Sequence, residues 1–197
     1  FTMKTKLKNK NLLFTMKILK IAIVFTSIML FSCSKKQEVI ITSPDNNVEV
    51  QFSLNEVGAA SYEVSYKNGK VIKPSTLGFD LKDQPSLKEK FEIINTVSSS
   101  FNETWQMPWG EQIDVKNNYN ELKIELQETT ELKRKLTIIF KVYDDGIGFR
   151  YEFPAQENLS EVFITDENTQ FNLTGDHKVW WIPGDWDIYE HLYSTTK

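Results

Sequence analysis

Apolar and polar residues alternate along most of the chain beyond the first forty positions, and this pattern predicts β-strands. Val48, Val50, Phe52 and Leu54 are separated by single polar residues. Successive side chains of a strand point to opposite faces, so each such segment has one apolar face. The same period-two pattern recurs at Tyr62, Val64, Tyr66, Leu122, Ile124, Leu126, Leu136, Ile138, Phe140, Val142, Phe149, Tyr151 and Phe153. No segment keeps a helical period over three turns. The sequence therefore predicts an all-β protein, a large antiparallel β-sandwich with one hydrophobic core.

Two turn signals predict how these strands connect. Asn68-Gly69 follows one alternating segment, and both residues tolerate positive φ, so we expect them at the central positions of a tight hairpin. Asp144-Asp145-Gly146 predicts a second reversal. Beyond that reversal, Arg150 and Glu152 share the face opposite the apolar residues, and we expect each to pair with a residue on a neighbouring strand.

The N-terminal region resembles a bacterial lipoprotein signal. Lys17 and Lys20 form a basic region at the start of the apolar run 18–31. The run itself is too short to span a membrane comfortably. Leu30-Phe31-Ser32-Cys33 then resembles a lipobox, in which Cys33 receives the lipid. An ordinary secretory signal with an incidental cysteine is the alternative.

These features divide the chain into three parts. Residues 1–33 are expected to be the lipoprotein signal peptide with an N-terminal extension, because Phe1 is no natural initiator while Met3 and Met16 both are possible starts. Residues 34–38 form a polar tether, and residues 39–197 form the sandwich. The expected location is the bacterial cell envelope, on the periplasmic side of the outer membrane and attached through a lipid.

Composition narrows the range of partners. The 197 residues carry a net charge of −4, and the basic residues outside the N-terminal cluster are spread out. This argues against binding to nucleic acid or to another polyanion. Cys33 is the single cysteine, so a disulfide framework is excluded.

The C-terminal run 180–193 concentrates the candidate chemistry. It contains three Trp and two Tyr, whose faces stack on sugars or fill cores, and it ends without a closing element, as an open-ended fragment would. Its carboxylates suit Ca²⁺ better than Zn²⁺, because Ca²⁺ takes six to eight hard oxygen ligands. The possible ligands are Asp176, His177, Asp185, Asp187, Glu190 and His191.

A second aromatic segment surrounds Trp105 and Trp109, which are separated by a turn sequence. Each Trp could plug the core or form a platform for a sugar ring, and we expect the plug. Glu111, after Gly110, is expected to be a solvated turn residue. The chain shows no Ser-His-Asp or Cys-His set, and we assign no catalytic or substrate-binding residue.

Four motifs together resemble one enzyme family, the N-terminal domain of glycoside hydrolase family 97, which contains α-glucosidases and α-galactosidases. In chain order they are Glu103-x-Trp105-x-x-x-Trp109-Gly110-Glu111, Asn118-Tyr119-Asn120-Glu121-Leu122, Asp145-Gly146-x-Gly148-Phe149-Arg150-Tyr151 and Trp181-Ile182-Pro183-x-Asp185-x-Asp187-x-Tyr189-Glu190-x-Leu192-Tyr193. The resemblance covers residues 38–197 approximately.

The resemblance implies a β-supersandwich related to galactose mutarotase, here truncated at the C-terminus. It also implies that the catalytic carboxylates lie on a (β/α)₈ barrel outside this fragment, which should be inactive alone. The family carries a Ca²⁺ near the active site, and the resemblance implies that Glu190 contributes one ligand. The implied partners are an oligosaccharide substrate, the protein's own barrel and the membrane.

Two other functions remain open. The chain could be a stand-alone carbohydrate-binding lipoprotein without catalysis. It could also be a mutarotase-like enzyme, which needs a His acid and a Glu base. The crowding of His177 and His191 near the C-terminus disfavours the latter.

Overall fold

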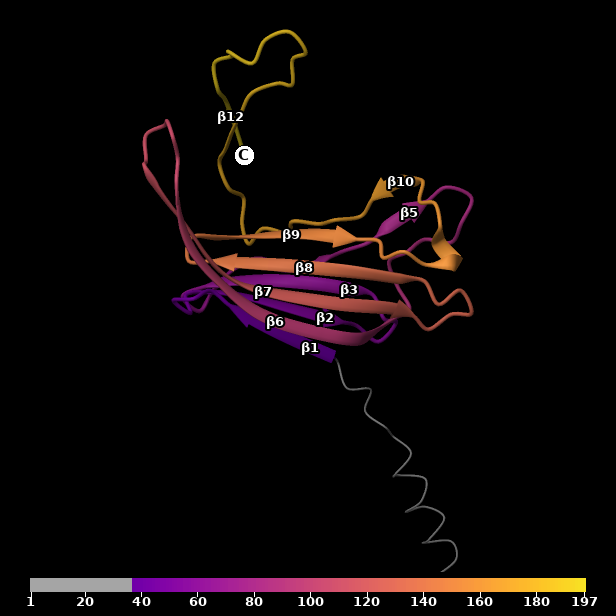
Figure 1. Cartoon of the computed structure of the whole chain (residues 1–197). Helices are drawn as coiled ribbons and strands as arrows, with labels where there is room; N and C mark the ends of the chain where they lie inside the picture. The colour runs from indigo at the N-terminus through magenta and orange to yellow at the C-terminus, as the bar shows by residue number, and fades with distance from the viewer. Residues whose placement is uncertain (1–36) are drawn as a thin grey trace, which may run out of the picture. The chain divides into compact units, whose positions relative to one another are not determined.

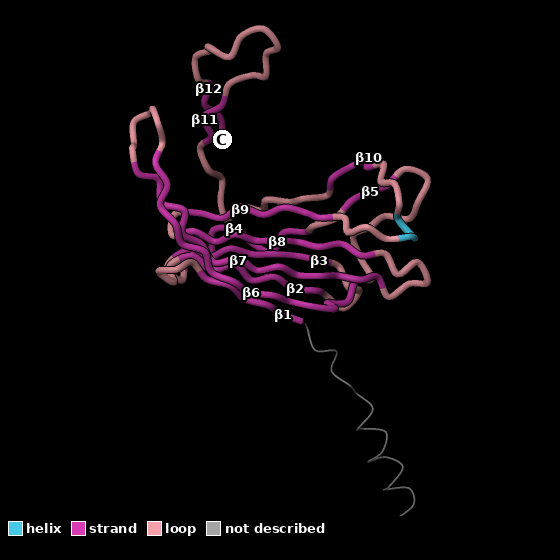
Figure 2. The backbone as a smooth tube through the Cα atoms, viewed as in Figure 1, coloured by secondary structure: helices cyan, strands magenta, loops and turns pink. Residues whose placement is uncertain are grey.

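The computed structural model of the protein describes residues 37–197. In this part of the chain, twelve strands form four antiparallel sheets, and the one helix is the short 3-10 turn η1 at Glu157–Leu159 (Figures 1 and 2). The strands are β1 Gln37–Thr42, β2 Val48–Leu54, β3 Ala60–Tyr66, β4 Gly69–Thr76, β5 Phe79–Leu81, β6 Phe91–Gln106, β7 Asp114–Glu128, β8 Lys135–Tyr143, β9 Gly146–Glu152, β10 Ile164–Glu167, β11 Val179–Trp181 and β12 Ser194–Thr196. β1 begins inside the segment 34–38 that the sequence assigned to the tether.

The first large sheet has the order β1-β2-β3-β4, and its hairpins follow the chain. Its β3–β4 turn differs from the prediction by one position. Lys67 and Asn68 have φ of 47° and 66° and occupy the centre of the turn, while Tyr66 pairs with Gly69. The Lys67 amide donates to the carbonyl of Asn47, which fixes where β3 ends, so Gly69 already belongs to β4.

The second large sheet has the order β6-β7-β8-β9. β6 and β7 are its longest strands, with 16 and 15 residues, and their hairpin extends past the ends of the neighbouring strands (Figure 1). β8 and β9 reverse at Asp144 and Asp145, so the predicted turn is confirmed.

The hydrophobic core lies between these two sheets. β1 lies against β7, and β2 lies against β8. The inward residues of β7 and β8, which are Leu122, Ile124, Leu126, Leu136, Ile138, Phe140 and Val142, are at most 1% exposed. From the first sheet, Val50, Phe52 and Tyr62 meet them. Burial of each such side chain contributes about 1.5–3 kcal/mol, so the alternation noted in the sequence supplies the driving force for the fold.

A segment after β10 continues the first sheet without being a regular strand. Residues 168–173 run along β4: the amide of Gln170 donates to the Thr76 carbonyl, and that of Lys73 to the Asn172 carbonyl. Leu173 forms a bridge with Ile72, and the Tyr62 hydroxyl donates to the Gln170 carbonyl at 2.9 Å. β5 and β10 form a small separate sheet next to the start of this segment.

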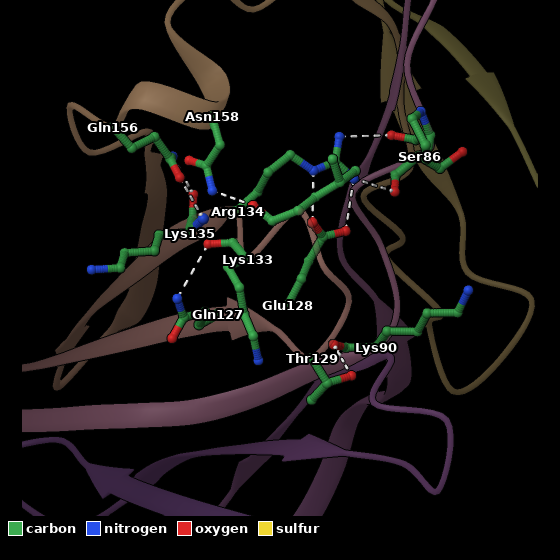
Figure 3. Close-up of polar contacts among 12 residues, drawn as sticks. Ser86, Lys90, Gln127, Glu128, Thr129, Lys133, Arg134, Lys135, Gln156 and Asn158 are labelled. Carbon is green, nitrogen blue, oxygen red and sulfur yellow. Dashed lines mark hydrogen bonds and ion pairs between the residues drawn. The ribbon is translucent and has the colours of Figure 1, made fainter.

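One buried ion pair ties the β7–β8 hairpin to the loop before β6 (Figure 3). Arg134 Nε and Nη2 donate to the two carboxylate oxygens of Glu128 at 2.6 and 2.7 Å. Arg134 Nη1 donates to the Pro85 carbonyl at 2.9 Å, and Nη2 also donates to the Ser86 carbonyl at 3.1 Å. Arg134 and Glu128 are almost fully buried, with 0% and 3% exposed. A buried charge is stable only when it is paired and hydrogen-bonded, and this arrangement meets both conditions.

Residues 37–197 contain no helix long and apolar enough to cross a bilayer. The apolar run 18–31, Cys33 and the expected signal peptide lie outside the described residues.

Replacement of one member of the buried pair should destabilise the protein strongly. Arg134→Met leaves the Glu128 carboxylate buried without a counter-charge, so we expect the free energy of unfolding in urea to fall by about 3–5 kcal/mol. The control is Lys70→Met, because Lys70 pairs with Glu63 at 2.7 Å in an exposed position. That variant should change the free energy by no more than about 1 kcal/mol. Equal losses in the two variants would contradict the assigned role of Arg134.

Candidate functional site

The C-terminal cluster lies on a loop that a small ladder closes at its base. β11 and β12 pair antiparallel, with Val179 opposite Thr196, Trp180 opposite Thr195 and Trp181 opposite Ser194. Residues 182–193 form the loop between these two strands, and this loop projects away from the large sheets (Figure 1). Trp186 and Leu192 are 98% and 93% exposed. The loop thus presents its aromatic and acidic residues outward, and none of them belongs to the core.

Inside this loop, one polar contact connects its two halves. His191 Nε2 lies 3.2 Å from Asp185 Oδ2, and Asp185 Oδ1 accepts from the amide of Asp187. The His191 amide donates to the carbonyl of Tyr189. Glu190 lies between these contacts, and its side chain is exposed. The turn therefore holds Glu190 on the solvent side of the loop, where its carboxylate is accessible.

The donor atoms on this loop do not build a complete calcium site. A Ca²⁺ ion takes six to eight oxygen ligands, and one carboxylate supplies two at most. Among residues 37–197 there is no group of three or more His, Cys, Asp or Glu side chains arranged to hold a metal. Asp176, His177, Asp185, Asp187 and His191 do not converge with Glu190. Glu190 fits a calcium site only as a single donor beside ligands from elsewhere.

The aromatic segment around Trp105 lies on the projecting β6–β7 hairpin, where the expectation of a core plug is wrong. Trp105 is 43% exposed near the end of β6, opposite Val115, and Trp109 is 82% exposed in the turn. Ile113 of the same turn is also exposed. This part of the hairpin extends past the sandwich, so no second layer covers these rings. Glu111 is a solvent-exposed turn residue, as expected.

The outer face of the second sheet carries an aromatic and basic cluster that the sequence did not reveal. Phe101 stacks on Tyr119 with centroids 5.3 Å apart, and Tyr143 lies 5.2 Å from Tyr119 on the other side. Lys141 Nζ donates to the Tyr119 hydroxyl at 2.9 Å and lies 4.1 Å from its ring centroid. The hydrogen bond to Tyr119 raises the pKa of Lys141. These residues come from three strands, and only the strand register brings them together.

Arg150 and Glu152 lie on this same face, but their predicted cross-strand pairing is wrong. Arg150 Nη2 donates to Glu152 Oε1 at 2.7 Å, so the two residues pair with each other along β9. The physical reason is the register, which places uncharged Ile139 opposite Arg150 and Thr137 opposite Glu152.

Two aspartates, the exposed Asp45 and the half-buried Asp80, each accept several local hydrogen bonds. The Ser43 hydroxyl, and next the Asn47 amide, lower the pKa of Asp45 to about 2. The Ser86 hydroxyl, and then Lys88 and Asn168, hold the pKa of Asp80 well below its usual range. Both carboxylates accept hydrogen bonds from nearby turn residues, and neither lines a cleft. We therefore assign them a structural role and no catalytic or binding role.

Comparison with known proteins shows to which family the chain belongs. The family model described as "Glycosyl-hydrolase 97 N-terminal" matches residues 41–197, which is most of the chain. The chain belongs to this family. The glycoside hydrolase family 97 resemblance of the four sequence motifs is thereby confirmed.

Solved structures of the family have the same fold as this N-terminal domain. A glycoside hydrolase family 97 enzyme from Pseudoalteromonas sp. strain K8, solved in complex with panose and also with acarbose, is 36% identical, with a TM-score of 0.73 over 80% of this chain. A beta-arabinopyranosidase is similar in fold, with a TM-score of 0.64 at 24% identity. The predicted β-sandwich is confirmed.

A curated relative is the retaining alpha-galactosidase of Bacteroides thetaiotaomicron, 22% identical over 120 residues that make up 61% of this chain. The family 97 domain described here spans only 17% of that enzyme and 24% of the Pseudoalteromonas enzyme.

Proposed function

We propose that the chain is the N-terminal domain of a longer, lipid-anchored glycoside hydrolase that cleaves α-glucosides or α-galactosides. The observation that carries this proposal is the agreement of family match and fold over residues 41–197. The relatives are hydrolases several times the length of this chain, and one was solved with oligosaccharides. The domain itself supplies no nucleophile or acid–base pair that we can assign, so its role is to shape the cleft of the catalytic module.

Within that role, Glu190 would give one oxygen ligand to a calcium ion shared with the catalytic module. The support is its exposed carboxylate, which lies on a loop whose two halves are joined by the His191–Asp185 contact at 3.2 Å. When bound, Ca²⁺ supplies positive charge that orients sugar hydroxyls or polarises water. The chain's own contribution is to hold the donor in place, because the β11–β12 ladder fixes both ends of the loop.

A stand-alone carbohydrate-binding lipoprotein is the second candidate. The exposed rings of Trp109 and Trp186 favour it, since a free indole face is a suitable platform for a sugar ring. The same rings would also serve as contacts to a catalytic module, so enzymatic activity separates the two candidates.

The proposed anchor is a lipid on Cys33, which would hold the enzyme at the bacterial cell envelope, on the periplasmic side of the outer membrane. Its support is the lipobox-like sequence Leu30-Phe31-Ser32-Cys33 after an apolar run.

Hydrolytic activity tests the main proposal. The longer protein should release sugar from p-nitrophenyl α-glucoside or α-galactoside, and from panose in the first case, while residues 37–197 alone should release none. Reducing-sugar and nitrophenol assays measure both. A β-glucoside serves as the negative control. Binding of oligosaccharide by the longer protein with no hydrolysis of either α-glycoside would reject the enzyme and support the binding lipoprotein.

Calcium titration tests the role of Glu190. Glu190→Gln keeps the shape of the side chain and removes its charge, so the longer enzyme should bind Ca²⁺ at least about tenfold more weakly, a loss of about 1.4 kcal/mol. Calorimetry and calcium-dependent activity both report this change. The matched control is Asp187→Asn on the same loop, which should leave the calcium affinity unchanged. An unaltered titration for Glu190→Gln would remove the assigned ligand.

Membrane fractionation tests the anchor. Cys33→Ala removes the thiol that accepts lipid, so the protein should lose incorporation of an alkyne-labelled fatty acid and should leave the membrane fraction. Ser34→Ala is the control, because it changes a neighbour without touching the thiol. Fatty-acid labelling that persists in Cys33→Ala would show that Cys33 is not the lipidated residue.

A further inference from the structure

The outer face of the second sheet contains a hollow between β8 and β9. Ile139, Lys141 and Tyr143 of β8 line it on one side, and Gly148 and Arg150 of β9 line it on the other. Its volume is about 230 Å³. Pockets for drug-sized ligands measure about 300–1,000 Å³, so this hollow has room for one small ring and not for a larger ligand.

Two glycines keep the hollow open. Gly146 and Gly148 lie opposite Tyr143 and Lys141 in the register of β8 and β9. A Cβ atom at either glycine would meet no heavy atom within 4 Å beyond its chain neighbours, and neither glycine has a positive φ. The backbone therefore does not require glycine at these positions, although glycine weakens a strand. Because glycine in a strand often marks the close approach of a ligand, the open space above β9 indicates a binding site.

Tyr143 supplies an aromatic surface at the rim of the hollow. Its ring lies 5.2 Å from that of Tyr119, which stacks on Phe101 from the other side. Its hydroxyl donates to Asn117 Oδ1 at 3.5 Å. These contacts hold the ring from the side of β7, and Tyr143 stays only half-buried. The apolar C–H face of a sugar ring packs well on an aromatic ring that is held in this way.

The charged groups beside the hollow are balanced in sign. Lys141 Nζ lies 3.8 Å from Glu121 Oε2, and Arg150 Nη2 donates to Glu152 Oε1 at 2.7 Å. The Arg150 side chain is 62% exposed, so its remaining N–H groups are accessible to a ligand. Lysine and arginine only donate hydrogen bonds, whereas ionised carboxylates only accept them. The rim therefore offers donors and acceptors side by side.

A neutral sugar fits these groups better than an ion does. A hydroxyl group both donates and accepts, so a ring that carries several hydroxyls can pair with Arg150 and Glu152 at once. An anion would be repelled by the carboxylates of Glu121 and Glu152. A cation would be repelled by Lys141 and Arg150. The paired charges thus favour an uncharged ligand that is rich in hydroxyls.

We propose that this hollow binds one pyranose ring of a neutral oligosaccharide. The ring packs its C–H face on Tyr143 in the space above Gly148, and its hydroxyls pair with Arg150 and the neighbouring charged groups. The inference goes beyond the proposed function, because it requires neither hydrolysis nor calcium. It also does not involve the exposed rings of Trp109 and Trp186.

Photoaffinity labelling of the longer protein tests the site. The probes are panose and melibiose, each with a diazirine at its reducing end, and an excess of the unmodified sugar is the competitor. Mass spectrometry should find label on the peptide that contains residues 139–150 with at least one probe, and the competitor should abolish it. Absence of competed label on this peptide with both probes overturns the proposal.

Filling the hollow tests which residues form it. Gly148→Leu places a side chain in open space, so labelling of residues 139–150 should fall at least about tenfold while the urea midpoint of unfolding stays unchanged. The control is Ser65→Leu, which adds the same side chain to the outer face of the first sheet and should not alter the labelling. Label that persists in Gly148→Leu, or an equal loss in Ser65→Leu, overturns the proposal. A lowered midpoint for Gly148→Leu also overturns it, because the hollow is then filled by the protein itself.

A second variant removes the aromatic surface instead of filling the space. Tyr143→Ala should also weaken the competed label on residues 139–150, and unchanged labelling would reject the assigned role of the ring. These readouts are separate from hydrolysis. Competed label in a protein without hydrolytic activity would support the site and reject the proposed enzyme, and an active enzyme without this label would do the reverse.

Discussion

The face-to-face packing of β7 and β8 on β1 and β2 is the interaction on which the rest of the structure depends. The inward residues of these strands, such as Val50, Ile124 and Phe140, are fully buried. Period-two patterning fixes the register, because a shift by one residue would turn every apolar side chain to solvent. The β6–β7 hairpin, the segment 168–173 and the loop 182–193 all extend from this core.

The strands and the core could be predicted from the sequence because the alternation of apolar and polar residues shows which face of each strand is buried. The position of the β3–β4 turn could not, since the hydrogen bond from the Lys67 amide to the Asn47 carbonyl decides it, and the alternation of residues does not show that bond. The exposure of Trp105 and Trp109 could not be predicted from the sequence either. An aromatic ring is buried only if a second layer reaches it, and strand length alone does not show where the facing sheet ends.

The buried pair of Glu128 and Arg134 has a signal in the sequence, although the alternation of apolar residues alone does not show it. Glu128 continues the inward series of Leu122 to Leu126 by one step, and Arg134 precedes Leu136 in the same phase. Charged residues of opposite sign at positions reserved for apolar side chains, on either side of one hairpin, indicate a buried ion pair. For Glu190 no comparable signal exists, because its proposed partners lie outside the described chain, and only the resemblance to the family directed attention to it.

Among residues 37–197, β9 pairs with β8 on one side and with no strand on the other, and this bears on how that part of the protein behaves in isolation. Gly146–Glu152 contains neither the lysine nor the proline with which natural sheets discourage edge-to-edge association. A preparation of residues 37–197 therefore exposes a seven-residue strand edge that a second copy can pair with, and its charges are those of Arg150 and Glu152. Fibrous or oligomeric material from such a preparation would reflect this exposed edge rather than a physiological assembly.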